Sequence, residues 1–537
     1  MRLRRSAWHN RTPGIVRFAL IAPFLMVGIT LLAPVAQGSQ SFQNSQDFLE
    51  LTLPRPFVDD SHWDQVLDRD GGKNVTFGVE FTGTSPYVRN SGRAFLPASV
   101  TKVFTTSAAL ERLGPDFRYV TRMQWRRVSE QDPTVVTELT LIGSGDPTWG
   151  MIEFREDLHT RIRTFVDALR KSGVRRVEGD IRMDADDPRW KELRYPEGWM
   201  PEDETACYGA LAQAFNLDIN CAHFQVSGVG RGHWLSSGVP VSVKLSVTSG
   251  VRTRLWVRPN RTDDGVAQGF TIGGTWAKGT PAESFYLPIH RTDAWIANLL
   301  REELARAGVR VRASSSAVPA QGVVLETFES FSPPLSEIIR PLNKASLNML
   351  ADALFKTLGS RFGSANVPLL EAGREVILDF VRGVGGATAL AQGESELPGF
   401  FVDQLDFYDG SGISRKNSVT TAGVMALLSD LTLKPYFPQM WESLPVAGVD
   451  GTLAGRMRGT SAEGILRAKT GTLRGSYNLA GYVPRFDSVS GAIVEFVPFV
   501  VLAETSPENR LVARAAQDRL GAALVTAVNG KRSRVLE

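Results

Sequence analysis

The chain has 537 residues, which is long enough for more than one hydrophobic core. Its composition, 43% hydrophobic and 22% charged, is that of a globular protein and excludes disorder along most of the chain. The net charge of +3 includes five arginines and no acidic residue among the first 38 residues, so the rest of the chain carries −2. A nearly neutral protein lacks the electrostatic footprint that binds nucleic acid, and we exclude nucleic acid as a partner.

The first 38 residues have the pattern of an export signal. Arginines precede an apolar run from Phe18 to Val35, and Ala36-Gln37-Gly38 places small residues where a signal peptidase cuts. We therefore expect residues 1–38 to be a signal peptide and the protein to be exported to the periplasm. The alternative is an uncleaved anchor at the membrane, because the run approaches the ~20 residues that span a bilayer. Pro23 and Pro34 favour cleavage.

The first predicted elements after this segment are a strand and a helix. Val75–Phe81 alternates between the two sides of a strand. From Ser99 to Leu113 apolar residues recur at helical spacing, and Gly114-Pro115 ends that helix.

Residues 123–325 differ from the preceding helical segment. Short segments in which apolar and polar residues alternate predict strands there. Three such segments are Val135–Ile142, Val177–Met183 and Val241–Val247, and Arg161–Ser172 is predicted to be a helix between two of them.

The same region holds the two cysteines of the chain, Cys207 and Cys221. In an exported protein, cysteines separated by thirteen residues are able to close a small loop by a disulfide. Such a loop contributes ~3 kcal/mol to stability in the chain-entropy account. The alternative is a pair of buried free thiols, which an oxidising compartment disfavours.

Helical patterns dominate from Leu335 to Phe380. Near the C-terminus, Gly464–Tyr482 and Gly491–Glu504 predict neighbouring strands of one sheet. Ser506-Pro507-Glu508 then caps a last helix that ends near Asn529-Gly530. We expect this helix to pack against the sheet; the alternative is peripheral contact with a membrane surface.

The first of three motifs is Ser99-Val100-Thr101-Lys102, at the start of the first helix. A serine hydroxyl is a poor nucleophile until a base removes its proton. Lys102 lies three residues after Ser99, a spacing that puts both side chains on one helical face. A desolvated lysine has a lowered pKa and acts as a base. By itself the motif is better explained by a serine that caps the helix.

The second motif is Lys469-Thr470-Gly471-Thr472 on a predicted strand. A glycine on an edge strand lets a substrate backbone approach and pair with it. Lys469 and Thr470 are candidates to bind a substrate carboxylate, and the backbone N–H of Thr472 is a candidate for the oxyanion hole. Alone, the motif is also explained by a strand that ends in a turn.

The third motif is Ser346-Leu347-Asn348, at the start of a helical run. Ser346 is a candidate to relay a proton to the leaving group, and the Asn348 amide is a candidate to hold a substrate carbonyl. A helix cap explains the tripeptide equally well when it stands alone.

Other chemistries lack their minimum parts in this sequence. It contains no His-Glu-x-x-His zinc helix, no Cys-x-x-Cys pair, no Gly-x-Ser-x-Gly elbow and no phosphate-binding loop. We therefore expect neither a metal nor an organic cofactor.

Together and in this order, the three motifs are the signature of penicillin-binding proteins and class A β-lactamases. The chain resembles the low-molecular-mass class C penicillin-binding proteins, the penicillin-binding protein 4 type of D-alanyl-D-alanine carboxypeptidase/endopeptidase, from about residue 75 almost to the C-terminus. The resemblance also rests on Leu96–Ser99, Gly114–Arg118, Gly145–Thr148, Gly198-Trp199, Asp409–Arg415, Leu444–Leu453, Lys469–Gly475 and Asn478–Tyr482. The long separation between Ser99 and Ser346 is typical of that family, which carries two extra domains there, whereas β-lactamases carry far less.

The resemblance implies an α/β (α+β) fold. Its catalytic domain would be penicillin-binding/serine β-lactamase-like, an antiparallel sheet flanked by helices, with a large inserted strand-rich region of two domains. The early helix and the late strands must meet if one site uses both. We therefore expect a discontinuous catalytic domain of residues 39–122 and 326–537, interrupted by accessory domains at 123–325.

The resemblance also implies the activity: a serine-type D-Ala-D-Ala carboxypeptidase and DD-endopeptidase that acts on peptidoglycan peptides through an acyl-enzyme and is acylated by β-lactams. Asp203 and Arg415 would shape the site for the distal end of the substrate's diaminoacid side chain, or have only structural roles. The middle residue of the Ser-x-Asn motif is usually Asp and is Leu347 here, and we expect activity to be retained. The alternatives are a β-lactamase-like hydrolase and a non-catalytic penicillin-binding wall protein.

Overall fold

The computed structural model describes residues 60–83, 85–128, 131–261, 267–312, 325–384 and 404–530. The predicted signal peptide, residues 1–38, lies outside these ranges. No helix within them is long and apolar enough to cross a bilayer.

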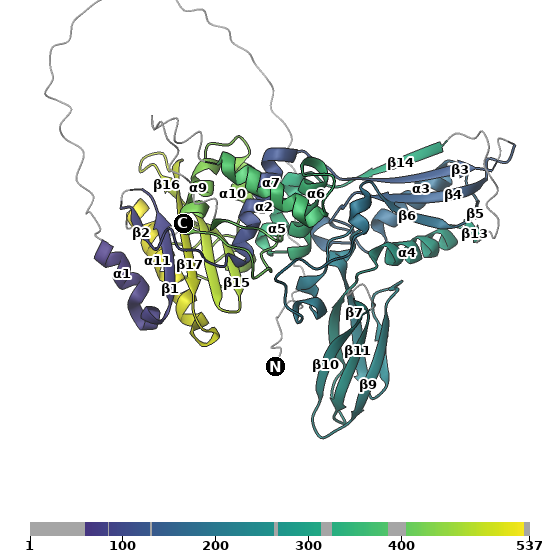
Figure 1. Cartoon of the computed structure of the whole chain (residues 1–537), viewed down its shortest axis with the longest axis horizontal. Coiled ribbons are helices and arrows are strands. Elements are labelled where there is room, and N and C mark those ends of the chain that lie inside the picture. The colour runs from purple at the N-terminus through teal and green to yellow at the C-terminus, as the bar shows by residue number, and fades with distance from the viewer. Residues whose placement is uncertain are drawn as a thin grey trace, which may run out of the picture. The chain divides into compact units, whose positions relative to one another are not determined.

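Within the described ranges, a five-stranded antiparallel sheet combines strands from an early and a late part of the chain (Figure 1). Its order is β15-β16-β17-β1-β2. The strands are β1 (Thr76–Phe81), β2 (Tyr87–Arg89), β15 (Arg467–Leu473), β16 (Ser476–Phe486) and β17 (Ile493–Glu504). Thr76 pairs with Glu504, so the first strand lies beside the last one. The predicted segment 464–482 contains two strands, β15 and β16, because the chain turns at Gly475.

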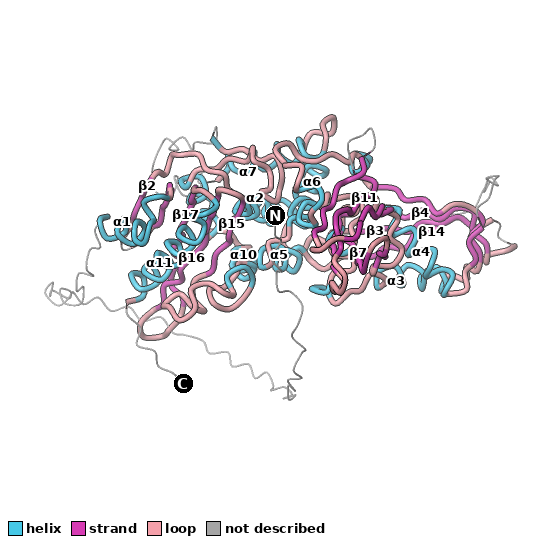
Figure 2. Tube along the Cα trace, turned by 90° about the horizontal axis from the view of Figure 1, so that it is seen from below, coloured by secondary structure: helices cyan, strands magenta, loops and turns pink. Residues whose placement is uncertain are grey.

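Helices cover both faces of this sheet (Figure 2). The helices of this region are α1 (Asp60–Asp68), α2 (Thr101–Leu113), α5 (Leu335–Lys344), α6 (Asn348–Phe362), α7 (Leu369–Gly383), α9 (Thr421–Leu431), α10 (Phe437–Ser443) and α11 (Arg510–Asn529). The last helix, α11, packs against β16, and Gln517 Nε2 donates to the Tyr477 carbonyl at 2.8 Å. The expectation that this helix packs on the sheet is confirmed. Because both faces are covered, nine consecutive residues of β16 are buried.

A second sheet follows in the middle of the chain, with order β13-β5-β4-β3-β14 and β6 beside β4 among the described residues. Its strands are β3 (Val120–Arg127), β4 (Val135–Gly143), β5 (Arg176–Glu178), β6 (Ile181–Ala185), β13 (Arg310–Arg312) and β14 (Leu325–Phe331), and its helices are α3 (Thr160–Lys171) and α4 (Thr292–Arg306). The single strand predicted at 177–183 is wrong. Gly179, at φ 146°, separates β5 from β6, and a Cβ there would lie 2.6 Å from the Thr137 carbonyl oxygen.

Two three-stranded sheets complete the described part of the middle region, with orders β12-β7-β8 and β10-β11-β9. Their strands are β7 (Cys221–Gly228), β8 (Arg231–Trp234), β9 (Ser242–Ser249), β10 (Arg254–Arg261), β11 (Ala267–Trp276) and β12 (Glu283–Pro288). The strand predicted at 241–247 corresponds to β9.

The buried apolar side chains of the described residues form two clusters. One is built almost wholly from residues before 120 and after 334, and the other from residues 123–309. The chain leaves the first cluster along β3 and returns along β14, which pairs with β3 from Val120↔Phe331 onward. This arrangement suits an insertion, and the domain boundaries at 122/123 and 325/326 stay a prediction.

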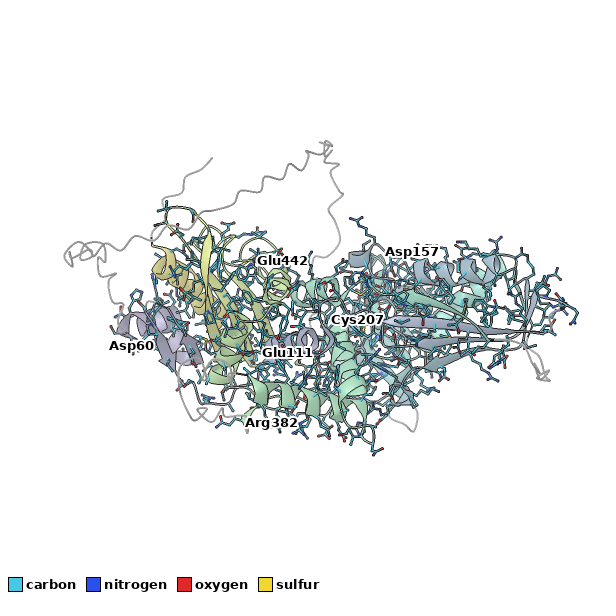
Figure 3. The ribbon with its side chains drawn as sticks, turned by 90° about the horizontal axis from the view of Figure 1, so that it is seen from above. Asp60, Glu111, Asp157, Cys207, Arg382 and Glu442 are labelled. Carbon is cyan, nitrogen blue, oxygen red and sulfur yellow. A yellow bond between two sulfur atoms is a disulfide. The ribbon has the colours of Figure 1, made fainter. Side chains whose placement is uncertain are left out.

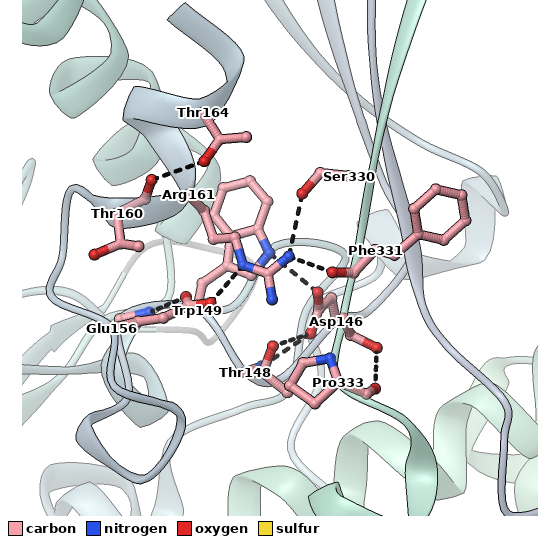
Figure 4. Close-up of polar contacts among 12 residues, drawn as sticks. Asp146, Thr148, Trp149, Glu156, Thr160, Arg161, Thr164, Ser330, Phe331 and Pro333 are labelled. Carbon is pink, nitrogen blue, oxygen red and sulfur yellow. Dashed lines mark hydrogen bonds and ion pairs between the residues drawn. The ribbon is translucent and has the colours of Figure 1, made fainter. Parts of the chain in front are cut away.

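A polar network fixes the end of β14 where the chain returns (Figure 4). Arg161 donates to Glu156 at 2.5 Å, to Ser330 Oγ at 3.1 Å and to the Phe331 carbonyl at 2.5 Å. Nearby, the buried carboxylate of Asp146 accepts from Thr148 and Trp149. Burial raises the pKa of Asp146, and these donors oppose that rise.

Candidate active site

Ser99 lies in a turn of 3-10 helix, Ala98–Val100, that runs directly into α2. The predicted helix is therefore present, with its first turn wound more tightly. Lys102 follows one turn later and is fully buried, and its Nζ lies 3.1 Å from Ser99 Oγ. Gly412, at φ 87°, packs directly on this turn, where a Cβ would meet the Ala98 carbonyl oxygen at 1.9 Å. A glycine is required there for the two backbones to approach.

The Lys102 ammonium group has two further partners. Its Nζ donates to Asn348 Oδ1 at 2.7 Å and to the Ser411 carbonyl oxygen at 2.5 Å. Burial lowers the pKa of Lys102 to about 8, and the charges of Asp352 and Asp409 oppose this shift. At neutral pH such a lysine is the neutral amine far more often than an ordinary lysine, and the neutral amine is able to accept a proton.

Asn348 is the first residue of α6, and Ser346 precedes it in a left-handed conformation at φ 57°. Asn348 Nδ2 donates to the Tyr208 carbonyl oxygen at 2.9 Å. Because a carbonyl accepts only, this bond fixes the amide orientation and leaves Oδ1 for Lys102. Leu347, at the position where the family usually has Asp, packs against the hydrophobic core and donates its backbone N–H to the Leu342 carbonyl at 3.0 Å.

Lys469 lies on β15, the edge strand of the five-stranded sheet, and is fully buried. Its Nζ donates to Ser346 Oγ at 2.9 Å and to the Thr470 carbonyl oxygen at 2.8 Å. Burial, reinforced by the charge of Lys102, holds the pKa of Lys469 well below that of an ordinary lysine. The motif serine and the motif lysine therefore form a second Ser–Lys pair beside the first.

The edge strand also brings its backbone close to Ser99. A Cβ at Gly471 would lie 2.6 Å from the Pro97 carbonyl oxygen, so only glycine allows this approach. Asn478 Nδ2, on the neighbouring strand, holds that same carbonyl at 2.7 Å. Thr470 Oγ1 donates to Thr452 Oγ1 at 2.8 Å, and the Thr472 side chain is exposed and accepts from Arg514 at 3.4 Å.

Asp203 and Arg415 lie together, with an Arg415 Nη1 to Asp203 Oδ2 distance of 3.4 Å. Asp203 is buried, and it accepts from the Tyr208 hydroxyl at 2.9 Å and from the Met200 backbone N–H at 2.8 Å. Tyr208 thus touches both this pair and Asn348. Burial, with the Asp203 charge, raises the pKa of Tyr208, so its hydroxyl stays protonated as a donor.

The residue before Tyr208 is Cys207, which forms a disulfide with Cys221 at the start of β7 (Figure 3). The two Cα atoms are 5.6 Å apart. The disulfide therefore ties the turn that carries Tyr208 to a strand of the middle region.

Sequence reasoning did not assign roles to several residues that the structure brings to the site. Asp352 is buried on α6 one turn after Asn348, and its Oδ1 accepts from the Gly410 backbone N–H at 2.9 Å. Burial, and then the charge of Asp409, raise the pKa of Asp352 to about 8. The sequence did contain a signal for Asp352. It lies four residues after Asn348, a spacing that places the two side chains on one face of a helix.

Asp409 is the second such residue and organises the segment that supplies the Ser411 carbonyl. Its carboxylate is fully buried and accepts four hydrogen bonds of 2.7 to 2.8 Å, donated by Trp199 Nε1, Gly412 N, Ser414 N and Asn417 Nδ2. These four donors offset the cost of removing the Asp409 side chain from water.

Within the described part of the chain, no group of three or more His, Cys, Asp or Glu side chains is arranged to hold a metal ion. The chemistry available to the site is that of two Ser–Lys pairs, one asparagine amide and an edge strand. Beyond the bridge of Arg467 to Val446, the outer side of this strand pairs with no other strand of the described chain.

The D-Ala-D-Ala carboxypeptidase 3 (S13) family matches residues 67–524, which is most of the chain. The chain belongs to this family. The chain is 33% identical over 453 residues to the D-alanyl-D-alanine carboxypeptidase of Actinomadura sp. strain R39, covering 78% of this chain and 77% of the relative. It is 25% identical over 446 residues to the D-alanyl-D-alanine carboxypeptidase DacB of Haemophilus influenzae, covering 79% and 85%. This S13 chain is a serine-type D-Ala-D-Ala carboxypeptidase.

Solved structures agree with this fold. The crystal structure of penicillin binding protein 4 (dacB) from Haemophilus influenzae superposes with a TM-score of 0.66 at 22% identity, covering 87% of the S13 chain described here and 100% of that chain. A second crystal structure of that protein, complexed with a β-lactam, gives a TM-score of 0.63 at 21% identity and covers 86% and 98%. The predicted fold, a penicillin-binding/β-lactamase-like α/β domain with extra strand-rich sheets, is confirmed.

Proposed function

We propose that this carboxypeptidase removes the terminal D-alanine from peptidoglycan stem peptides through an acyl-enzyme on Ser99. One observation carries the proposal: three motifs from distant parts of the chain converge on two Ser–Lys pairs. Lys102 contacts Ser99 at 3.1 Å, and Lys469 contacts Ser346 at 2.9 Å. Asn348 joins them, because its Oδ1 accepts from Lys102.

Lys102 acts as the base for Ser99. Of the three groups around its Nζ, the Ser411 carbonyl and Asn348 Oδ1 only accept hydrogen bonds. A neutral amine has two N–H donors, and these two acceptors use both of them. The lone pair then points to the third neighbour, Ser99 Oγ, and takes its proton as Oγ attacks the carbonyl carbon of the penultimate D-alanine.

Backbone N–H groups stabilise the charge that develops on the substrate oxygen. The proposed oxyanion hole consists of the N–H groups of Ser99 and Thr472. The substrate would extend along the free side of β15, next to Gly471, and Lys469 and Thr470 would bind its terminal carboxylate. The short approach between Gly471 and Pro97 supports this placement, since it brings the strand beside the nucleophile.

Ser346 protonates the leaving amine. As the C–N bond breaks, the Ser346 hydroxyl gives its proton to the nitrogen of the departing D-alanine. The ammonium form of Lys469, which the lowered pKa makes a ready proton donor, then returns a proton to Ser346 Oγ and becomes the neutral amine. Asn348 orients the peptide. Water then attacks the ester on Ser99 and releases the shortened peptide. When the leaving amine belongs to a cross-linking side chain, the same steps constitute DD-endopeptidase activity.

We assign peptide specificity to Asp203 and Arg415. They bear opposite charges, lie 3.4 Å apart and are joined to Asn348 through Tyr208. This placement suits recognition of the charged distal end of the diaminoacid side chain. Replacing either charge should raise KM for a stem peptide more than it lowers kcat.

β-Lactams should acylate Ser99 by the same route, because the lactam carbonyl and carboxylate occupy the positions of the peptide carbonyl and the terminal carboxylate. We further propose that the protein is exported to the periplasm, where its substrate lies, after cleavage of residues 1–38.

One experiment tests the function. Purified protein is labelled with a penicillin, the covalent adduct is followed by mass spectrometry, and D-alanine release is measured from a stem peptide. A persistent adduct together with D-alanine release supports the proposal. Rapid loss of the adduct without D-alanine release would identify a β-lactamase-like hydrolase, and a persistent adduct without D-alanine release would identify a non-catalytic penicillin-binding protein.

A further inference from the structure

The sheet β9–β11 contributes no residue to the proposed reaction. One side of these strands packs into the core of the middle region, through side chains that include Phe270 and Ile272. The other side is open, because alternate residues of β9 and β10 are exposed. We call this outer side the Trp256 face. At one end of the sheet β10 contacts the 3-10 turn Asp203–Thr205, where Arg261 pairs with Glu204.

Trp256 occupies the middle of this face. Strand register places it opposite Gly273 on the central strand β11, and Gly273 is in turn opposite Ser246 on β9. The indole lies directly on Gly273, where a Cβ would meet its Cζ2 atom at 2.3 Å. Arg258, two residues along the same strand, places its guanidinium carbon 4.7 Å from the centre of the Trp256 ring. The indole is thus supported by its neighbours and still 40% exposed.

The residues around the indole are basic or hydroxylic. The three strands contain four basic residues and no acidic residue in their sequences. Of these, Lys244, Arg254 and Arg258 are exposed on the Trp256 face. In the row next to Trp256, Arg258 pairs with Thr271 and Thr271 with Lys244, so a threonine lies between two cations. Adjacent strands are about 4.8 Å apart, and the row therefore spans roughly 10 Å.

We propose that the Trp256 face binds a pyranose polymer that carries carboxylates, namely the glycan strand of the cell wall with its peptides. The identity of this polymer rests on the proposed function, whereas the binding itself requires no catalysis. The C–H face of a pyranose is apolar and packs on a flat, rigid indole. Sugar hydroxyls pair with the serine and threonine hydroxyls beside it. The carboxylates of the wall peptides complement the arginines and the lysine.

Such a site would hold the enzyme on the wall while the catalytic residues act on neighbouring peptides. A second attachment raises the effective concentration of the active site near an insoluble substrate. The Trp256 face should therefore affect turnover of intact wall, and not turnover of a small soluble peptide.

The test is co-sedimentation of the full-length Ser99→Ala protein with purified peptidoglycan sacculi, a background that prevents digestion. In this background Trp256→Ala should weaken binding about fivefold or more, as expected for loss of a central aromatic contact. Gly273→Ala should weaken binding in the same direction, because its Cβ displaces the indole without removing it. Tyr286→Ala is the matched control, since Tyr286 is an aromatic residue on β12 of the neighbouring sheet and is 52% exposed.

Binding to sacculi stripped of their peptides distinguishes the contribution of the glycan strand from that of the wall peptides. Weakened but measurable binding to stripped glycan, still sensitive to Trp256→Ala, supports the proposal. Equal binding of wild type, Trp256→Ala and Gly273→Ala to intact sacculi would overturn it. It would also be overturned if Trp256→Ala lost binding to phosphatidylglycerol vesicles while its binding to sacculi was unchanged, because the face would then recognise a membrane. These outcomes are read in protein that lacks the nucleophile, so a failure here is distinct from a failure of the proposed reaction.

Discussion

The side-chain amide of Asn348 donates a hydrogen bond of 2.9 Å to the backbone carbonyl of Tyr208. This bond connects a motif residue on α6 with a turn that belongs to the middle of the chain. The disulfide between Cys207 and Cys221 holds that turn against β7. The geometry around Lys102 therefore depends on a cross-link that lies outside all three motifs.

Replacing both cysteines, Cys207→Ser with Cys221→Ser, should lower both stability and activity. Loss of a native disulfide that closes a short loop costs about 2–4 kcal/mol, and urea unfolding monitored by circular dichroism measures that cost. Because Tyr208 positions Asn348, penicillin acylation should also slow severalfold. Wild-type protein treated with a reductant should behave in the same way. An unchanged unfolding midpoint and acylation rate would contradict this role of the disulfide.

Lys102→Met removes the proposed base while it keeps the volume of the buried side chain. The rate of acylation by penicillin should fall about 10²–10⁴-fold, the usual contribution of a positioned base. Lys356→Met is the matched control. Lys356 is also buried with its pKa lowered to about 8, but its Nζ donates to the Ala212 carbonyl at 2.9 Å and not to a motif residue. If the acylation rate fell by a similar factor in both variants, the cause would be the replacement of a buried lysine in general and not the loss of the base.

The pH dependence of acylation should report the pKa of Lys102. The neutral amine is the active form, so the rate should rise with pH through about 8 and level off above it. The Asp352 carboxylate raises the pKa of Lys102, so Asp352→Asn should move this midpoint to lower pH. Asparagine still accepts from the Gly410 N–H through its Oδ1, which keeps the fold. A midpoint that stays in place, or moves to higher pH, would exclude Asp352 as the group that tunes the base.

Gly471→Ala should slow acylation on the order of 10²-fold, because a displacement of about 1 Å at a reacting centre has effects of that size. The added Cβ would lie 2.6 Å from the Pro97 carbonyl and would push β15 away from Ser99. Gly455→Ala provides the control, since a Cβ at Gly455 meets nothing within 4 Å. Stopped-flow measurement of penicillin acylation distinguishes the two variants. Full activity in Gly471→Ala would argue against close approach of the edge strand to the nucleophile.

The motifs predicted much of the site because their chemistry is local. Ser99 and Lys102 share a helical turn, and Lys469 and Gly471 share one side of a strand, so spacing alone places each pair. The order of the motifs then implied that distant segments meet, and the pairing of Thr76 with Glu504 accounts for that meeting.

The residues that were missed depend on tertiary contacts that spacing does not encode. Tyr208 reaches Asn348 only because the middle region folds back onto α6, and Ser411 contributes a backbone carbonyl that carries no sequence signal. The segment 177–183 was predicted as one strand because its alternation of apolar and polar residues continues across Gly179. In the structure the chain turns at Gly179, close to Thr137, and two strands result. Leu347 lacks the usual acid, and its contact with the hydrophobic core supplies a different support for the motif.

The most direct test of the central claim is the location of the penicillin adduct. Trypsin releases residues 94–102, Ala-Phe-Leu-Pro-Ala-Ser-Val-Thr-Lys, as one peptide that contains Ser99. Mass spectrometry of labelled protein should find the added mass of the penicillin on this peptide, with fragmentation that assigns it to Ser99, and should find none in Ser99→Ala. An adduct on any other peptide, or an undiminished adduct in Ser99→Ala, would contradict the assignment of Ser99 as the nucleophile.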